Sequence, residues 1–136
     1  MNILITGASG FIGYALAKRL SSLKNKIYIT DNFYRGKYDK YFKELLLKKN
    51  VYFFKADLTK KNNFKKFPEK IDLIFHLAAI NGTKNFYNIP EKVLTVNTLI
   101  NINLLEYLKN NPKIKTIFSS SSEVYASTTD LLNNKI

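Results

Sequence analysis

The chain has 136 residues, 46% of them hydrophobic and 24% charged, values that fit a single globular domain. Its 22 Lys and Arg residues against 10 Asp and Glu give a net charge of +12, which raises the hypothesis of a nucleic-acid partner. The absence of cysteine excludes a disulfide framework, a Cys-ligated zinc site and a thiol nucleophile, and the single His76 cannot form a multi-histidine metal site by itself.

The positive charge is almost entirely lysine, because Arg19 and Arg35 are the only arginines. Arginine is the side chain best suited to bidentate contacts with phosphate and guanine, so this composition favours a solvated surface over a specific nucleic-acid site. A basic RNA-binding protein stays open as a less favoured alternative. No apolar run reaches the roughly 20 residues that cross a bilayer, and the N-terminus lacks the basic segment of a signal peptide. We therefore expect no membrane partner and a cytoplasmic location.

Short apolar runs and helical patterns alternate from the start of the chain. The run Ile3–Ile5 predicts a buried strand, and a helix is expected from about Phe11 to Leu23. A second short strand follows over 27–30, closed by an Asp-Asn pair. Residues 38–49 have the pattern of an amphipathic helix, and residues 51–54 that of a third strand.

The alternation continues through the second half. A short helix is expected over 59–66 with Thr59 as its cap, and a fourth strand over 71–77. A long helix is expected from Pro90 to about Lys109, since proline is tolerated at a helix start. The last expected element is a strand over 114–118, followed by a run of serines.

This alternation predicts an α/β fold with one parallel sheet, because a right-handed helical crossover is the usual way to join parallel strands. We expect the strand order 3-2-1-4-5, with helices on both faces of the sheet. No repeat, low-complexity linker or internal boundary divides residues 1–136, so we expect a single domain.

The turn between the first strand and the first helix has the composition of a phosphate-binding loop. It reads Gly7-Ala8-Ser9-Gly10-Phe11-Ile12-Gly13. Small residues let the backbone approach a pyrophosphate, the free N–H groups of the helix start bind the anion, and Gly13 lets the helix pack tightly on the strand. The glycine spacing differs from the usual G-x-G-x-x-G, and glycines also occur in plain turns. The preceding strand, the following helix and an acid downstream favour a dinucleotide.

That acid is Asp31, at the end of the second expected strand. A carboxylate there accepts hydrogen bonds from the adenosine ribose of NAD, each contributing about 1.5–3 kcal/mol. It would repel the 2′-phosphate of NADP by roughly 4 kcal/mol at 4 Å in an effective dielectric of about 20, of which Arg35 could offset a part. We therefore predict NAD rather than NADP. A plain turn at Asp31-Asn32 is the alternative interpretation.

Six segments of the chain together resemble the extended short-chain dehydrogenase/reductase superfamily, and within it the NAD-dependent epimerase/dehydratase family that acts on nucleotide sugars. They are Thr6–Gly13, Asp31–Gly36, Ala56–Leu58, His76–Ala79, Val96-Asn97 and Ser119–Tyr125. The segments follow family order and spacing over nearly the whole chain. The resemblance implies a Rossmann-type doubly wound sheet, NAD as cofactor, a nucleotide sugar as substrate and a homodimer for the complete enzyme.

The resemblance also assigns roles to single residues. Asp57 and Leu58 would hold the adenine edge, and Asn97 would organise the site from the long helix. Residues 77–79 would form the floor under the pyrophosphate and the nicotinamide ribose, whereas His76 is expected to be structural. The full set implied to bind the cofactor is Gly7, Ser9, Gly10, Phe11, Ile12, Gly13, Asp31, Asn32, Arg35, Asp57, Leu58, Leu77, Ala78, Ala79 and Asn97.

Two catalytic residues are implied after the fifth expected strand. Ser121 occupies the position of the family's catalytic Ser or Thr, and a hydroxyl at the carboxyl end of a parallel strand faces the ligand crevice. Glu123 occupies the position of an acid that transfers protons in family members that decarboxylate or dehydrate. A solvated surface glutamate is the alternative for Glu123.

The family's Tyr-x-x-x-Lys pair would fall about 25 residues after the serine, beyond Ile136. Tyr14 and Lys18 have this spacing, but they lie far upstream and we interpret the match as chance. We therefore expect the NAD-binding part of a larger enzyme that works by transient hydride transfer, truncated before strand six and the substrate domain. The alternative is a non-catalytic or degenerate dinucleotide-binding fragment.

Overall fold

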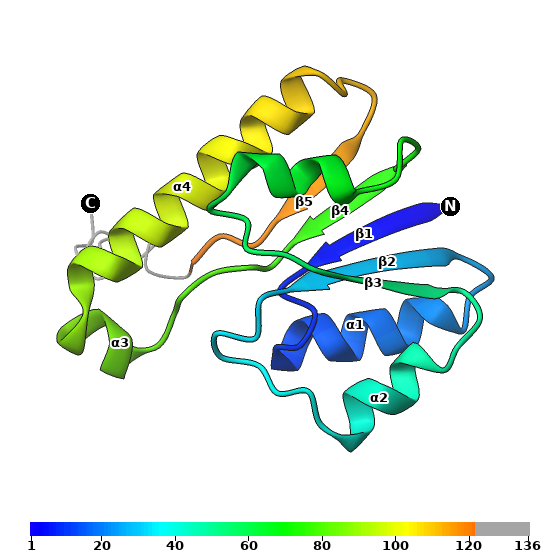
Figure 1. Ribbon diagram of the computed structural model, residues 1–136, viewed down its shortest axis with the longest axis horizontal. Helices are drawn as coiled ribbons and strands as arrows, with labels where there is room; N and C mark the ends of the chain where they lie inside the picture. The colour runs from blue at the N-terminus through cyan, green and yellow to red at the C-terminus, as the bar shows by residue number, and fades with distance from the viewer. Residues whose placement is uncertain (122–136) are drawn as a thin grey trace, which may run out of the picture.

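In this computed structural model, which describes residues 1–121, five strands form one sheet (Figure 1). The strand order is β3-β2-β1-β4-β5, and every neighbouring pair is parallel, which confirms the predicted fold class and order. The strands are β1 (Asn2–Thr6), β2 (Lys26–Asp31), β3 (Val51–Lys55), β4 (Leu73–His76) and β5 (Lys115–Phe118).

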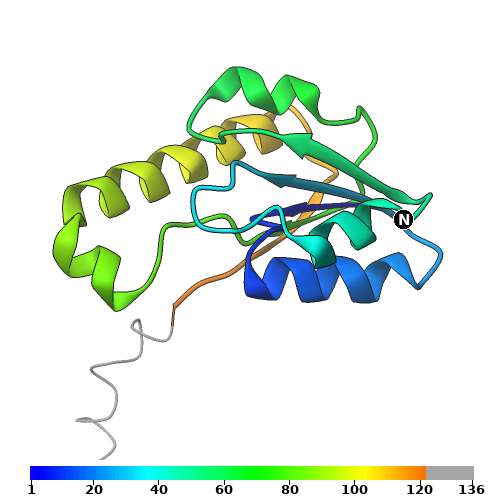
Figure 2. The ribbon, with the colours of Figure 1, turned by 60° about the horizontal axis from the view of Figure 1, so that its bottom comes forward.

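Helices cover both faces of this sheet, as Figure 2 shows: α1 and α2 lie on one face, and α4 and the 3₁₀ helix η1 lie on the other. Their bounds are α1 (Phe11–Ser21), α2 (Lys40–Leu46), η1 (Lys61–Lys66), α3 (Thr83–Asn88) and α4 (Pro90–Lys109). None of the helices in the described part of the chain is long and apolar enough to span a membrane.

Alternate side chains of β1 supply two separate cores. Ile3 and Ile5 pack with Phe42 and other apolar residues on the face covered by α1 and α2. Leu4 packs with Ile74 and Ile100 on the opposite face, beneath α4. Because both faces are covered, the central strand is buried at consecutive positions, as expected for a parallel sheet.

Two expected helices differ from those in the structure. The helix predicted over 38–49 is shorter, because the Asp39 side chain caps α2 by accepting a first-turn N–H at 2.9 Å. The predicted cap at Thr59 is wrong, since η1 begins after Lys60. The N–H and the hydroxyl of Thr59 both donate to the Asp57 carboxylate instead, at 3.0 and 2.8 Å.

The remaining differences are at element ends and in one extra helix. The strand expected over 71–77 is confined to β4. The helix α3 was not predicted, because none of its six residues is buried and it has no apolar stripe. The long helix begins at Pro90, as predicted. Within the described residues β5 pairs only with β4, so it forms an edge of the sheet.

Candidate functional site: a dinucleotide crevice

The carboxyl ends of β1, β2 and β4 meet beside the start of α1 (Figure 1). Parallel strands place their carboxyl ends at one edge, and ligands bind there in α/β folds, most often where the strand order reverses. In this sheet the strand order reverses beside β1. The chain first adds β2 and β3 on one side of β1, and then adds β4 and β5 on the other side.

The turn after β1 is built on glycines that have no room for a side chain. Gly7 has φ +69°, and a Cβ there would lie 2.8 Å from the carbonyl oxygen of Leu77. A Cβ on Gly13 would lie 2.3 Å from the carbonyl oxygen of Gly7. The predicted close packing of α1 at Gly13 is therefore confirmed, and the turn is fixed between α1 and the loop after β4.

Asp31 joins the end of β2 to this turn. Its Oδ2 accepts the N–H of Ser9 at 2.9 Å, and its Oδ1 accepts the N–H of Phe33 at 2.7 Å. A carboxylate has about four acceptor sites. Asp31 therefore organises the edge and keeps acceptor capacity for a ribose hydroxyl.

A hollow of about 470 Å³ lies at the ends of β2 and β3 and is lined by Asn32, Tyr34, Lys55, Ala56 and Asp57. It brings together two of the residues expected to bind the cofactor, Asn32 and Asp57. Leu58 is different, because its side chain is only 5% exposed and belongs to the core. Any contact of Leu58 with a ligand must therefore come from its main chain.

On the β4 side, the hydroxyl of Thr6 is the centre of the hydrogen bonding. Its Oγ1 accepts the N–H groups of Leu77 and Ala78, both at 3.1 Å, and lies 3.0 Å from Nδ1 of His76. Two accepted bonds use both lone pairs, so the hydroxyl proton is donated to Nδ1 and His76 carries its own proton on Nε2. Sequence reasoning assigned no role to Thr6. The available signal was a hydroxyl ending an otherwise apolar strand.

His76 is a buried structural residue, as expected. It is 2% exposed, and its ring stacks on Phe118 with centroids 5.8 Å apart. Burial lowers its pKa from 6.5 to about 4, an effect that the neighbouring Asn101 side chain partly offsets. The ring is therefore neutral at pH 7. No group of three or more His, Asp or Glu side chains that could hold a metal occurs among residues 1–121.

Asn97 anchors the loop after β4 to the long helix. Its Oδ1 accepts the N–H of Ile80 at 2.8 Å, and its Nδ2 donates to the carbonyl oxygen of the same residue at 2.9 Å. These paired bonds hold the segment that contains Leu77, Ala78 and Ala79. The role that the resemblance implies for Asn97 towards a cofactor stays a prediction.

The Ser9 side chain gives a direct test of whether an anion fits. Its Oγ is buried and has no hydrogen-bond partner among residues 1–121. Leaving a buried hydroxyl unpaired costs about 1–3 kcal/mol. The unpaired hydroxyl, the N-terminus of α1 and the glycine backbone together suit a pyrophosphate oxygen, so the residues present fit a dinucleotide.

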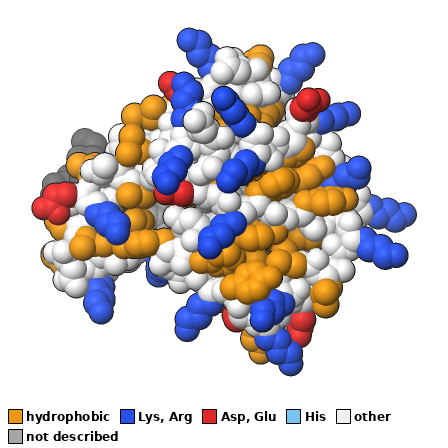
Figure 3. All heavy atoms as spheres, in the orientation of Figure 1, with side chains coloured by type: hydrophobic (Ala, Val, Ile, Leu, Met, Phe, Trp, Pro, Cys, Tyr) orange, Lys and Arg blue, Asp and Glu red, His pale blue; other side chains and the backbone are white. Residues whose placement is uncertain are grey.

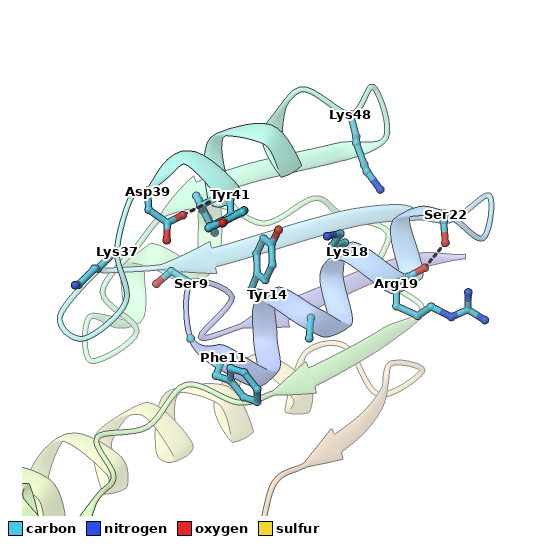
Figure 4. A pocket seen from close by; sticks show the side chains of 13 residues that line it. Ser9, Phe11, Tyr14, Lys18, Arg19, Ser22, Lys37, Asp39, Tyr41 and Lys48 are labelled. Atoms are coloured by element: carbon cyan, nitrogen blue, oxygen red, sulfur yellow. Dashed lines mark hydrogen bonds between the residues drawn. The ribbon is translucent and has the colours of Figure 1, made fainter.

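A larger hollow of about 740 Å³ lies between α1 and α2 (Figure 4). It meets the phosphate turn at Ser9 and Phe11. Tyr14 and Lys18 line it farther along α1, with the Lys18 ammonium 5.9 Å from the centre of the Tyr14 ring. This is where the structure places the upstream Tyr-x-x-x-Lys match.

The remaining predicted residues are placed as follows. Ser121 is exposed three residues after β5, on the edge where the N–H of Ser119 donates to the carbonyl oxygen of His76. Glu123 lies outside the described residues. Arg35 donates to the main-chain oxygen of Asn81 at 3.1 Å and to its side-chain oxygen. The guanidinium is therefore bound on the β4 side of the crevice.

The basic side chains form no single stripe on the face shown in Figure 3, where Lys and Arg are scattered over the surface and its rim. A groove that tracks a nucleic-acid backbone concentrates positive charge along one path. The distribution on this face therefore gives no support to the RNA-binding alternative.

The model of the NAD dependent epimerase/dehydratase family matches residues 3–135. The chain belongs to this family. Over 122 residues, this epimerase/dehydratase-family chain is 37% identical to UDP-N-acetyl-alpha-D-glucosaminuronate decarboxylase of Bacillus cytotoxicus. Among solved structures it resembles the UDP-Glc/GlcNAc 4-epimerase of Campylobacter jejuni, with 29% identity and a TM-score of 0.82. The Bordetella bronchiseptica enzyme WbmF in complex with NAD+ has 26% identity and a TM-score of 0.78.

These matches cover most of this chain and a minor part of each relative. The match to the decarboxylase covers 90% of this chain and 37% of the decarboxylase. The match to the epimerase covers 91% of this chain and 38% of the epimerase, and the match to WbmF covers 90% of this chain and 36% of WbmF. The chain therefore spans less than two fifths of the length of these relatives.

Proposed function

We propose that this chain is the NAD-binding part of a nucleotide-sugar epimerase, dehydratase or decarboxylase that works by transient hydride transfer. The observation that carries the proposal is the meeting of the glycine turn, the unpaired Ser9 hydroxyl and Asp31 at one edge of the sheet. The family's NAD dependence and the nucleotide-sugar names of two relatives support it.

In this proposal the crevice holds NAD along its length. The N-terminus of α1 and the Ser9 hydroxyl bind the pyrophosphate, and Asp31 accepts hydrogen bonds from the adenosine ribose. Asn32 and Asp57 line the hollow for the adenine. Residues 77–79, held by Thr6 and Asn97, form the floor towards β4. NAD, when bound, accepts a hydride from the sugar and returns it.

Ser121 is the proposed catalytic hydroxyl of this chain. It follows β5, whose carboxyl end lies beside that of β4, so it stands on the side of the crevice opposite the adenine hollow. Its role is to hydrogen-bond the sugar hydroxyl that loses its proton. Glu123 is the proposed proton-transfer residue for a decarboxylating or dehydrating reaction.

The test is calorimetry of the chain with NAD and with NADP. We expect NAD to bind at least about tenfold more tightly, because the Asp31 carboxylate repels the 2′-phosphate. Asp31→Ala should weaken NAD binding and remove the preference. Glu44→Ala, which deletes an exposed acid on α2, is the matched control and should change neither. Equal affinities for the two cofactors, or an unchanged preference in Asp31→Ala, would contradict the proposal.

A non-catalytic dinucleotide-binding module is the second candidate. Within these 136 residues no Tyr-x-x-x-Lys follows Ser121, since Tyr125 has Thr129 rather than lysine four residues later. Both candidate functions use the same crevice to bind the dinucleotide, but only the enzyme converts a nucleotide sugar. A steep dependence of RNA binding on salt would instead support the basic RNA-binding protein.

A further inference from the structure

The segment that joins β2 to α2 crosses in front of the phosphate turn. We call residues 32–36 the 32–36 loop. β2 and β4 pair with opposite edges of β1, and the phosphate turn follows β1 directly. Any contact between the loop after β2 and the loop after β4 must therefore pass across the end of β1, where the turn lies.

Two contacts cross it, from neighbouring residues of the loop: one reaches the loop after β4 and the other reaches α4. Arg35 donates from Nη1 to the main-chain oxygen of Asn81, at 3.1 Å, and to its side-chain oxygen. The ring of Tyr34 lies under the ammonium of Lys92, 4.5 Å from Nζ to the ring centre. Both partners lie on the β4 side of the crevice.

The two anchoring residues are themselves held by helices. The main-chain oxygen of Asn81 also accepts a hydrogen bond from Nδ2 of Asn85, in α3, at 2.9 Å. Lys92 is the third residue of α4. The loop is thus tied to two helical elements rather than to another loop alone.

Directly after these contacts, at Gly36, the loop rests on the phosphate turn. A Cβ added to Gly36 would lie 1.8 Å from Oγ of Ser9 and 2.7 Å from its carbonyl oxygen. There is no space for a ligand between the loop and Ser9 in this arrangement. The same arrangement leaves the Ser9 hydroxyl buried and unpartnered among residues 1–121. The loop therefore covers a polar group suited to the pyrophosphate.

We propose that Asn81 and Lys92 are positioning residues that hold the 32–36 loop as a strap across the phosphate turn, so that a dinucleotide enters when the strap lifts. This inference rests on the proposed function, because it assumes that the dinucleotide pyrophosphate binds at this turn. A closed strap lowers the fraction of free protein that can accept the ligand, because it leaves no space for one beside Ser9.

The strap makes a kinetic prediction that differs from simple loss of a contact. Weakening an anchor should accelerate association on the order of three- to tenfold and lower Kd by a similar factor, with the dissociation rate nearly unchanged. A residue that merely contacted the cofactor would change the dissociation rate and Kd together. Stopped-flow measurement of NADH fluorescence gives both rates and so distinguishes a strap from a residue that only contacts the cofactor.

The variants are Asn81→Ala and Lys92→Ala, singly and combined. Asn110→Ala and Lys109→Ala at the far end of α4 are the matched controls, since they remove the same groups without touching the loop. The association rate should rise and Kd should fall in the anchor variants, and both should stay at wild-type values in the controls. Thermal unfolding of each variant confirms that it is folded.

A second experiment closes the strap instead of opening it. Because the chain lacks cysteine, Tyr34→Cys with Lys92→Cys can be joined by a short, reducible thiol cross-linker. Cross-linking should slow NADH association at least about tenfold, and reduction should restore it. Equal NADH kinetics in the wild type, the anchor variants and the cross-linked protein would overturn the strap alone. Absence of NADH binding in every form would overturn the proposed function and the strap with it.

Discussion

At the scale of single residues, one hydroxyl links the ends of two strands. Thr6 closes β1, and its Oγ1 holds the first two N–H groups after β4. His76 completes the arrangement, because only a neutral imidazole leaves Nδ1 free to accept the Thr6 proton. The main chain at Leu77 and Ala78, the proposed cofactor floor, thus depends on the protonation state of a buried ring.

We expect stability to fall as the pH decreases from 7 to 5. The pKa of His76 is about 4 in the folded chain and 6.5 when solvated, so the unfolded state takes up a proton in this range and the folded state does not. The free energy of unfolding should decrease by about 2 kcal/mol between pH 7 and pH 5. Urea denaturation at both pH values measures the change.

His76→Gln is the control for this prediction, because glutamine can accept the Thr6 proton and does not titrate. Its free energy of unfolding should be nearly the same at pH 7 and pH 5, since free carboxylates titrate mainly below this range. A wild type as stable at pH 5 as at pH 7 would show that the ring is not buried in the neutral form.

At the scale of elements, the start of α1 is the part of the site best determined by the sequence. The spacing of Gly7, Gly10 and Gly13 reflects three backbone contacts, and a side chain at Gly13 would collide with the Gly7 carbonyl oxygen. An ordinary helix position would instead gain stability from alanine, by about 1 kcal/mol. The sign of the change in the free energy of unfolding on Gly→Ala therefore distinguishes a glycine required for packing from one that is not.

Gly13→Ala should destabilise the chain by about 3 kcal/mol, because relief of the 2.3 Å contact requires α1 to move away from β1. Lys18→Ala, an exposed position on the same helix, should change the free energy of unfolding by less than about 0.5 kcal/mol. Chemical denaturation measures both variants. A Gly13→Ala protein as stable as the wild type would mean that α1 does not pack on the turn as described.

Elements with a periodic apolar face could be predicted from the sequence, and contacts between loops could not. Strand order followed from the alternation of elements and the right-handed crossover rule. Asp31 could be assigned to the site because it ends an apolar run. Asn81 could not, because it lies in a polar segment without periodicity and acquires its role only by contact with Arg35, 46 residues away. Thr59 was misassigned because η1 begins only after Lys60, and Thr59 instead lies in the turn where its N–H and hydroxyl donate to Asp57.

At the scale of the whole molecule, the edge strand β5 exposes apolar side chains. Ile117 and Phe118 are 50% and 54% exposed on this edge strand. Unpaired strand edges and apolar patches promote pairing with other chains. Leu94, Ile102 and Leu105 are also exposed on α4. The surface beside β5 is therefore the part of the described structure that we expect to associate.

We predict that the chain self-associates at micromolar concentrations through the β5 edge, and that Ile117→Lys reduces this association. A lysine on an edge strand must be desolvated before another strand can pair with it. Leu47→Lys, which also replaces an exposed apolar residue but lies after α2, is the matched control. Sedimentation velocity over a concentration series should show weaker association for Ile117→Lys only. Identical behaviour of both variants would place the interface elsewhere.

We also predict that these 136 residues alone bind NAD without converting nucleotide sugars. Ser121 can share a hydrogen bond with a substrate hydroxyl, but no Tyr-x-x-x-Lys follows it in the chain to take the proton. Incubation with NAD and a panel of UDP-sugars, followed by mass spectrometry, should detect no product. Turnover that disappears in Ser121→Ala would show that the chain contains a complete site.

The central position of β1 has a consequence for the order of folding during synthesis. β1 is made first, yet its two neighbours in the sheet are residues 26–31 and 73–76. One edge of this buried central strand therefore stays unpaired until more than half of the chain has been made. Pairing between segments so distant in sequence is slow, because a long loop must close before the contacts form. A ribosome-bound chain that ends before β4 should consequently expose β1 to chaperones, and one that extends past His76 should not.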